Sequence, residues 1–485
     1  MRRNVVLLVS TLLIFNYVAS SKVPRVAIIG GGIGGASTSH FLTELLNNSL
    51  KIDLYDAKTV GGRLATVRIN NYDFEAGGSI IHAKNMYMQK FIEMLGLEQI
   101  DAIGDGSMGV WTGDEFICKG SGLAIKAQLF LRYGTQVPKL IEHVNKILED
   151  FMRIYDLQDA GRSFNNVTAL LAAINKDFPQ LLQISAKDHL LHMGFSEKLI
   201  DELVQAAILA NFGEDVNIQS FVSLVSLAAT IPTDGSLWSV KGGNNLVPKR
   251  LIYKNKNVNV LSSRVTKIRY LADNSDSSQY ELTYVDKDSD NTDPTTSNYD
   301  IVIIATPLTQ DQAFPIEFVG FPESLSFPGT FRTTHVTFVN ADLKPKYFGL
   351  SHALDDIISC KCDKTKFSAI GKQSPVDGST KKDLRVWKIF SRNPIDNLIN
   401  KMFSNIDEKK EVVWKMSPHY STDERHDKFK LHDALYHVNA IEWAASAMEM
   451  SSIAGKNVAL LASNDFLQKH DSTLSENHVH VSHEL

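Results

Sequence analysis

The stretch VAIIGGGIGGAS, residues 26–37, decides the fold of this chain. The apolar run before the glycines is rich in β-branched residues and suits a buried parallel strand. The residues after the glycines place Phe41, Leu42 and Leu45 at helical spacing. A Gly-x-Gly-x-x-Gly turn between a strand and a helix is typical of dinucleotide-binding domains. We therefore predict an α/β fold built on a Rossmann-type domain.

The glycines of this turn have separate predicted roles. Gly30 permits the tight turn, Gly32 lets the backbone approach a pyrophosphate, and Gly35 lets the helix and strand pack closely. The phosphates would lie at the positive N-terminus of the helix. The next predicted strand ends in Asp56, whose carboxylate can accept hydrogen bonds from the two ribose hydroxyls of an adenosine.

Residues 1–20 are predicted to be a secretory signal peptide. Two arginines begin this segment, an apolar run spans residues 5–15, and small residues follow. The apolar run is shorter than the roughly 20 residues that a membrane anchor needs. No later stretch of the sequence is long and apolar enough to span a bilayer, so we expect the mature chain in the secretory pathway. The sequons at Asn47 and Asn166 predict N-glycosylation.

The composition is that of a globular protein of two or three domains. The chain has 485 residues, of which 44% are hydrophobic and 22% are charged. A formal net charge of −5 leaves no basic excess, so we expect no nucleic-acid partner.

Three cysteines are too few for a disulfide scaffold. If Cys360 and Cys362 lie on a strand, both thiols point to one side of it. A disulfide from one of them to Cys118 and three unpaired thiols remain open alternatives. Because no cluster of His or Cys lies nearby, we predict no metal site.

Three further segments indicate FAD rather than NAD. The segment of residues 60–82 contains Gly-Gly-Arg soon after Asp56, and resembles the flavin-contacting segment of the amine-oxidase and phytoene-desaturase flavoproteins. Residues 238–251 resemble the Gly-Gly-Asn segment of those proteins, and residues 299–307 their Asp-x-Val-x-x-Ala-Thr-Pro strand. Together with the glycine turn, these segments follow the order and spacing of that superfamily.

The C-terminal half narrows the resemblance to one family. Residues 414–461, together with residues 386–391 and 194–204, resemble the prenylcysteine oxidase family, and the resemblance extends from about residue 23 to residue 461. It implies a lysosomal FAD-dependent thioether oxidase that acts on farnesyl- and geranylgeranyl-cysteine from degraded prenylated proteins. The implied co-substrates are molecular oxygen and water. The implied products are a prenyl aldehyde, free cysteine and hydrogen peroxide.

The resemblance also implies positions for the cofactor. Val265 would lie against the adenine, and residues 442–445 would pass near the isoalloxazine. Outside the glycine turn and Asp56, the implied FAD-binding residues are Gly62, Arg63, Gly78, Ser79, Val265, Glu442 and Ala445. His82, His419 and Tyr420 are catalytic candidates by position only, and a structural role is favoured for each because a lone histidine seldom proves a base.

The predicted domains are interleaved along the chain. The FAD-binding domain is expected to combine residues 23–120, 236–310 and 431–470. An α+β substrate domain is expected from residues 121–235 and 311–430. Helical apolar spacing in residues 137–157 and 196–213, and predicted strands in residues 331–343 and 385–391, support this second domain.

Two other functions share some of these features. An amine oxidase of the same fold would contain the same flavin motifs and differ in its substrate domain. A secreted lipid-binding protein could retain a decayed flavin site, although the intact glycines, Asp56 and Arg63 argue against decay. Secretion remains the alternative to a lysosomal location, and peripheral association with lipid remains open.

Overall fold

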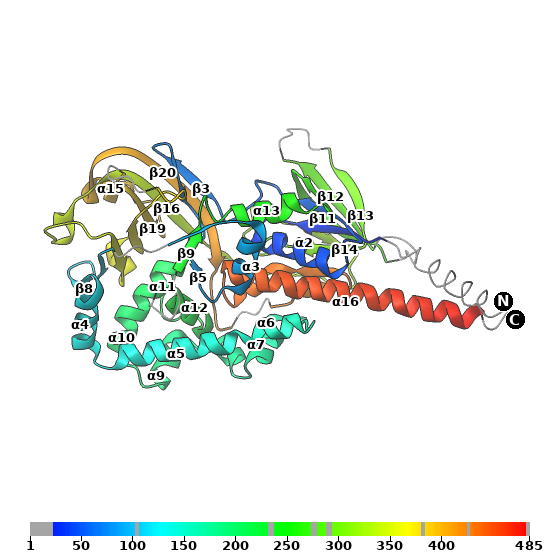
Figure 1. The fold of residues 1–485 in the computed structure, drawn as a ribbon, viewed down its shortest axis with the longest axis horizontal. Coiled ribbons are helices and arrows are strands. Elements are labelled where there is room, and N and C mark those ends of the chain that lie inside the picture. Colours follow the sequence, from blue (N-terminus) through cyan, green and yellow to red (C-terminus); the bar gives the residue numbers. More distant parts are fainter. Residues whose placement is uncertain are drawn as a thin grey trace, which may run out of the picture.

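A computed structural model describes residues 23–101, 106–230, 237–272, 279–287, 293–379, 384–423 and 427–481. The predicted signal peptide and the last four residues lie outside the described ranges. Within those ranges, no helix is both long and apolar enough to cross a membrane. Figure 1 shows two halves, a dinucleotide half around α2 and β14 and a substrate half around β16 and α5.

The dinucleotide half contains the predicted Rossmann-type sheet. Its order is β10-β2-β1-β14-β22-β21, in which all neighbours are parallel except the edge pair β22–β21. The strands are β1 (Arg25–Ile29), β2 (Lys51–Tyr55), β10 (Val258–Leu261), β14 (Ile301–Ile304), β21 (Lys430–His432) and β22 (Leu435–His437). The glycine turn lies between β1 and α2 (Ile33–Leu45), which confirms the strand-turn-helix prediction.

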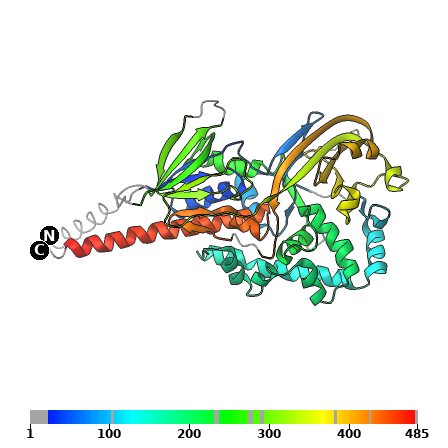
Figure 2. The same cartoon turned by 180° about the vertical axis from the view of Figure 1, so that it is seen from behind.

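Alternate residues of β1 face opposite sides of the Rossmann-type sheet and pack against different layers. Val26 and Ile28 pack in the core formed with the helices, and Ala27 and Ile29 pack against an antiparallel sheet. The helices are α2, α3 (Met86–Leu95), α13 (Leu246–Lys254) and α16 (Met448–Val481). The antiparallel sheet has the order β13 (Thr295–Tyr299), β12 (Tyr280–Asp286), β11 (Ser263–Tyr270) and β15 (Glu317–Val319). Both views show α16 running along α2 and then beyond the body of the protein (Figures 1 and 2).

The substrate half combines a seven-stranded sheet with a group of helices. The sheet order is β20 (Phe403–Pro418), β16 (Phe331–Leu343), β19 (Val386–Ser391), β18 (Ala369–Lys372), β17 (Asp356–Ser359), β7 (Met108–Trp111) and β8 (Phe116–Gly120). The helices include α4 (Gly122–Tyr133), α5 (Gln136–Phe151), α6 (Arg153–Asp159), α7 (Val167–Ile174), α9 (Ala186–His192), α11 (Gln205–Phe212) and α12 (Ser220–Thr230). The strands predicted at residues 331–343 and 385–391 and the two predicted helical regions are confirmed.

Short elements connect the halves. A hairpin of β3 (Thr66–Ile69) and β4 (Tyr72–Glu75) packs its apolar side chains against β16 and β19. A small sheet is formed by β5 (Ile81–His82), β9 (Leu237–Val240) and β6 (Gln99–Asp101). The chain therefore crosses between halves immediately after the Gly-Gly-Arg segment.

Strand pairing differs from the predicted boundaries at two places. The strands β7 and β8 lie inside the predicted FAD-binding range 23–120, but they pair in the seven-stranded sheet of the substrate half. The strand β15 lies inside the predicted substrate range 311–430, but it pairs with β11 of the dinucleotide half. In both cases, pairing with a strand that is distant in sequence decides which sheet the strand joins.

The three cysteines are buried and free. Cys118 lies in β8, whereas Cys360 follows the end of β17 and Cys362 begins the short helix α14 (Cys362–Thr365). The prediction that Cys360 and Cys362 share one side of a strand is wrong. The chain turns after Ser359 because the hydroxyl of Ser359 accepts a hydrogen bond from the backbone N–H of Lys361 at 3.0 Å, which starts the turn into α14.

Candidate functional site

The glycine turn is packed so closely that side chains would collide with backbone at two positions. Gly30 has φ +111°, and a Cβ there would lie 2.6 Å from the carbonyl oxygen of Ala305. A Cβ on Gly35 would lie 2.0 Å from the carbonyl oxygen of Gly30. Contacts this short are not tolerated, so the turn and the close approach of α2 to β1 both require glycine.

Gly32 faces open space instead. It is the residue that precedes α2, with φ −73°, and a Cβ added there would have the Cα of Gly62 as its nearest neighbour, at 4.0 Å. Among the described residues, no side-chain atom lies within 4 Å of that added Cβ. A helix N-terminus with free backbone N–H groups is a natural site for a phosphate, so the cradle fits the pyrophosphate of a dinucleotide.

Asp56 lies beside this cradle at the carboxyl end of β2. Its Oδ2 accepts a hydrogen bond from the N–H of Gly31 at 2.9 Å, and its Oδ1 accepts one from the N–H of Lys58 at 2.8 Å. These two bonds hold the carboxylate at the edge of the turn. Its position fits the predicted contact with an adenosine ribose, which stays a prediction.

The Gly-Gly-Arg segment packs directly against the glycine turn. The N–H of Gly61 donates to the carbonyl of Gly31 at 2.9 Å, and a Cβ on Gly62 would lie 3.2 Å from the Cα of Gly32. This contact brings the Gly-Gly-Arg segment against the glycine turn, and the flavin contact that the resemblance implies for this segment stays a prediction.

Arg63 joins the Gly-Gly-Arg segment to the C-terminal segment around Glu442. Its guanidinium forms a bidentate ion pair with Glu442, in which Nη1 lies 3.0 Å from Oε2, and Nη1 also donates to the carbonyl of Met416 at 2.6 Å. The Glu442 side chain is buried, with 1% of its surface exposed. Burial by itself would lower the pKa of Arg63, but the adjacent Glu442 carboxylate raises it by more, so the guanidinium stays charged.

The segment around Ala445 is held from the substrate half. The N–H of Ser446 donates to the phenol oxygen of Tyr420 at 2.9 Å, and Ala445 itself is fully buried. Burial raises the pKa of Tyr420 well above its ordinary value, so the phenol stays protonated. Tyr420 therefore positions the segment that follows Glu442.

A buried network holds the loop of Gly78 and Ser79. The side-chain amide of Asn244 donates to the carbonyls of Gly78 and Ser79 at 2.9 and 3.1 Å. The ammonium of Lys388 in β19 donates to the carbonyl of Glu75 at 2.9 Å and to the hydroxyl of Ser79 at 3.2 Å. Burial lowers the pKa of Lys388 to about 8 and raises the pKa of Glu75 to about 7.

Neither side-chain partner of this loop was predicted from the sequence. Asn244 lies in the Gly-Gly-Asn segment, in which its side chain had no predicted role. Lys388 is the one charged residue within the apolar strand β19, and that interruption was the available signal.

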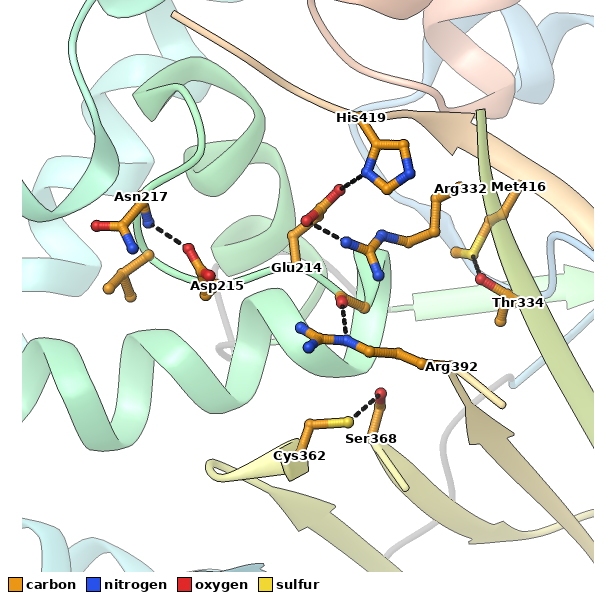
Figure 3. A network of polar contacts seen from close by, with 12 residues as sticks. Glu214, Asp215, Asn217, Arg332, Thr334, Cys362, Ser368, Arg392, Met416 and His419 are labelled. Carbon is orange, nitrogen blue, oxygen red and sulfur yellow. Dashed lines mark hydrogen bonds and ion pairs between the residues drawn. The ribbon is translucent and has the colours of Figure 1, made fainter. Parts of the chain in front are cut away.

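The remaining candidates come from different elements of the fold. His82 ends strand β5, where its Nδ1 accepts a hydrogen bond from the N–H of Lys84 at 3.0 Å, and burial lowers its pKa. His419 lies in the substrate half with its Nδ1 3.3 Å from Oε1 of Glu214 (Figure 3). Val265 is buried in β11, in the core beneath the Rossmann-type sheet. Their predicted roles stay predictions.

Both sequons lie on described parts of the chain. Asn47 is exposed after α2. Asn166 is partly exposed, and its Oδ1 accepts a hydrogen bond from the N–H of Ala169 at 2.7 Å at the start of α7. Asn166 therefore caps this helix.

Two family descriptions match the chain. Residues 121–476 match the family described as prenylcysteine lyase, and residues 28–95 match the NAD(P)-binding Rossmann-like domain. The first match runs through the substrate half and into α16, and the second covers the glycine turn and Asp56.

Curated relatives extend over nearly the whole chain. Prenylcysteine oxidase 1 of Mus musculus is 35% identical over 461 residues, which cover 90% of this chain and 88% of the relative. The protein of the same name from Homo sapiens is 35% identical over 463 residues, with the same shares. Prenylcysteine oxidase 1-like of Bos taurus is 33% identical over 462 residues and 92% of each chain.

Solved structures share the fold at lower identity. A redesigned putrescine oxidase has a TM-score of 0.58 at 13% identity and covers 90% of this chain and 99% of that chain. A putative protoporphyrinogen oxidase from Exiguobacterium sp. has a TM-score of 0.56 at 14% identity, with 91% and 99% covered. Identities this low establish a common fold and carry no argument about substrate.

Proposed function

The chain belongs to the prenylcysteine lyase family, and from that premise we propose that it cleaves the thioether of farnesyl- and geranylgeranyl-cysteine as an FAD-dependent oxidase. The observation that carries the proposal is the 35% identity that spans 90% of this chain and 88% of a prenylcysteine oxidase 1. Because the family match includes residues 121–476, the similarity extends well beyond the cofactor-binding turn.

The proposed reaction is a two-electron oxidation with balanced products. One prenyl thioether, one O2 and one water give one prenyl aldehyde, one cysteine thiol and one hydrogen peroxide. When bound, FAD supplies the acceptor for the hydride of the prenyl C1 and the route for two electrons to oxygen. Positive charge left at C1 is shared by the sulfur and the allylic double bond, so this carbon is the easiest to oxidise.

The chain contributes cofactor binding and orientation. Gly32 and Asp56 provide the phosphate cradle and the ribose acceptor. Asn244 and Lys388 hold the loop of Gly78 and Ser79 by its carbonyl and hydroxyl groups. Fixing these groups in a buried environment places reacting atoms in one geometry and excludes water.

A lysosomal location is part of the proposal. The predicted signal peptide and two sequons support entry into the secretory pathway. Burial raises the pKa values of Glu75 and Glu449 to about 7, and each protonated carboxyl favours the folded state at acidic pH. Co-localisation of the full-length protein with a lysosomal marker, and a mass shift on removal of N-glycans, would test this. A cytosolic, unglycosylated protein would contradict it.

An anaerobic absorption experiment tests the proposed reaction. The purified protein should show a flavin band near about 450 nm, and S-farnesylcysteine should bleach this band in a single turnover. Deuterium at C1 of the farnesyl group should slow the bleaching, whereas deuterium elsewhere on the chain should not. A flavin-containing protein that is bleached by putrescine and not by S-farnesylcysteine would overturn the thioether proposal and leave the fold unaffected.

The amine-oxidase alternative has no independent support. Its structural relatives share 13–15% identity with this chain, and that likeness concerns the fold alone. The saturated analogue of S-farnesylcysteine provides the chemical control, because it lacks the allylic double bond and should react far more slowly than the natural thioether.

A further inference from the structure

The helix α4 carries apolar side chains on the side that faces solvent. Leu123 is 83% exposed, Leu131 is 85% exposed and Phe130 is 58% exposed. Their spacing of i, i+7 and i+8 places the three side chains on one face of the helix. We call this the outer face of α4, and its exposed residues are Leu123, Ala124, Lys126, Ala127, Phe130 and Leu131. A surface helix of a globular protein normally has its apolar residues on the opposite face.

Polar side chains hold the inner side of α4. The side-chain amide of Gln128 donates to the carbonyl of Lys119 at 2.9 Å and accepts from the N–H of Lys119 at 3.1 Å. The guanidinium of Arg132 donates to the carboxylate of Glu202 at 2.6 Å and 2.7 Å. The polarity of the helix is therefore inverted, because polar groups attach it to the protein while the outer face is left to water.

The gathering of apolar side chains on the outer face is unusual for this molecule. Among the described residues, the other large apolar side chains that are more than half exposed are Tyr253, Phe314 and Val413, and they come from separate segments. Single exposed apolar residues are ordinary on a protein surface. Several of them on one face mark an interaction surface.

The charge on the outer face is positive. Lys126 is its one charged residue, and α4 contains no Asp or Glu. The exposed Lys119 lies next to the helix, near the end of β8. Acidic side chains nearby, including Glu115 and Glu202, line a polar cleft with Arg132 on the inner side of α4. An apolar face with cationic neighbours fits a lipid surface with anionic headgroups.

The position of α4 leaves the outer face accessible to a flat surface. Both views place α4 near one end of the molecule, and α16 extends beyond the other end (Figures 1 and 2). A stable contact with a second copy would bury about 800 Å² and 20–30 residues on each side, which is more than one short helix face provides. A lipid surface needs no matching shape, so a few apolar side chains can enter it.

We propose that the outer face of α4 docks the protein on a lipid surface that carries anionic headgroups. Leu123, Phe130 and Leu131 enter the boundary between headgroups and acyl chains. Lys119 and Lys126 contact the phosphates. The helix then lies in the plane of the surface, and the rest of the protein stays in water. This inference goes beyond the proposed function and does not depend on it, because neither the cofactor nor a prenyl thioether takes part in the docking.

Flotation with lipid vesicles tests the docking in the FAD-loaded protein. Vesicles of phosphatidylcholine and phosphatidylserine should bind the wild type, and vesicles of phosphatidylcholine alone should bind it more weakly. The double variant Leu123→Gln/Leu131→Gln should lower the partition coefficient at least about tenfold, because both leucines lose their transfer into an apolar layer. Lys126→Gln should weaken binding to the anionic vesicles about fivefold and leave binding to the neutral vesicles unchanged.

Phe314→Gln/Val413→Gln is the matched control, because it removes two exposed apolar side chains from separate segments. It should bind vesicles as the wild type does. Melting temperature and flavin content should match the wild type in every variant, since all the changed side chains are exposed.

Three results would overturn the docking surface and leave the proposed oxidase standing. They are equal binding by the wild type and Leu123→Gln/Leu131→Gln, no wild-type binding to either kind of vesicle, and a dimer in sedimentation analysis that Leu123→Gln/Leu131→Gln abolishes. A protein that docks as expected but makes no peroxide from S-farnesylcysteine would overturn the proposed function alone.

Discussion

The turn between β1 and α2 and a pocket beside β16 are built from different parts of the chain. The turn uses backbone N–H groups within residues 30–35, with Asp56 a short distance further on. The pocket is lined by the side chains of Arg332 and Arg392, which come from separate parts of the chain, and Arg332 pairs with Glu214. The turn depends on the absence of a side chain at its glycines, and the pocket depends on which charged side chains the fold brings together.

This difference predicts different responses to substitution. In the turn, an added carbon meets backbone that cannot move, so the expected damage is to the fold. At the pocket, a change of Arg392 alters charge at a position that is 31% exposed, so the expected damage is to the local charge balance and not to the fold. The Arg63–Glu442 pair lies between these regions and should show both kinds of effect.

The largest expected effect is the loss of folded protein in Gly35→Val. Its Cβ would lie 2.0 Å from the carbonyl oxygen of Gly30, and α2 would have to move away from β1. We expect destabilisation above about 4 kcal/mol, seen as little soluble protein and no cooperative melting. Gly32→Ala is the matched variant, because its Cβ faces open space, and it should fold but retain little flavin. A stable Gly35→Val protein that binds flavin would contradict the expectation that Gly35 is needed for folding and Gly32 for cofactor binding.

Glu442→Gln should have the next largest effect. It leaves the charge of Arg63, whose side chain is 32% exposed, without its buried carboxylate partner, so the cost should lie below the roughly 3–5 kcal/mol of a fully buried pair and above about 1 kcal/mol. Chemical denaturation measures this loss. The control is Glu317→Gln, which breaks the exposed pair with Lys267 and should cost less than about 1 kcal/mol. Similar costs for the two variants would show that burial of the Glu442 carboxylate does not strengthen its pair with Arg63.

The third expected effect is a pH dependence from Glu449 at the start of α16. Its carboxyl accepts hydrogen bonds from the N–H groups of Tyr87 and Met88 and from the phenol of Tyr155. Burial raises its pKa from 4.5 to about 7. The folded state therefore binds this proton more tightly than the unfolded state. The resulting stability is complete below about pH 4.5 and is lost as the pH rises to about 7, a total of about 3 kcal/mol.

Glu449→Gln should remove this dependence. The free energy of unfolding, measured at pH 5 and pH 8, should differ less in the variant than in the wild type. Glu98→Gln serves as control, because the Glu98 pKa is lowered by its hydrogen bond with Lys241 and Glu98 is already ionised at pH 5. An unchanged pH dependence in Glu449→Gln would assign the titration to another group.

The smallest of these effects should come from Asp56→Ala, which removes a charged acceptor and leaves the turn intact. Hydrogen bonds to a charged group contribute about 1.5–3 kcal/mol, so flavin should bind about ten- to a hundredfold more weakly. Flavin retained after dialysis is the measurement. Asp73→Ala, in the exposed hairpin of β3 and β4, should retain the wild-type amount. Full retention in Asp56→Ala would remove Asp56 from the cofactor site.

Much of the dinucleotide half was predictable because its signals are local. Strand, glycine turn, helix and acid follow one another within residues 25–56, and the structure has them in that order. The helices around residues 137–157 and 196–213 were also predicted, since apolar spacing and the capping Ser196 are visible in the sequence. The assignment of β7 and β8 to the substrate sheet was not predicted, because β7 joins that sheet by pairing with β17, which lies far along the chain.

The sequence by itself determined the Rossmann-type turn, the choice of glycine at positions 30, 32 and 35, and the family. The turn and its glycines depend on backbone geometry over a few adjacent residues, which amino-acid type controls directly. The family is recognised from motifs along the sequence. Only the tertiary structure decided that Lys388 supports the loop of Ser79 and that Arg332 and Arg392 meet beside Met416. Burial and charge balance at these sites arise from elements that are distant in sequence, and no local pattern encodes a distance between them.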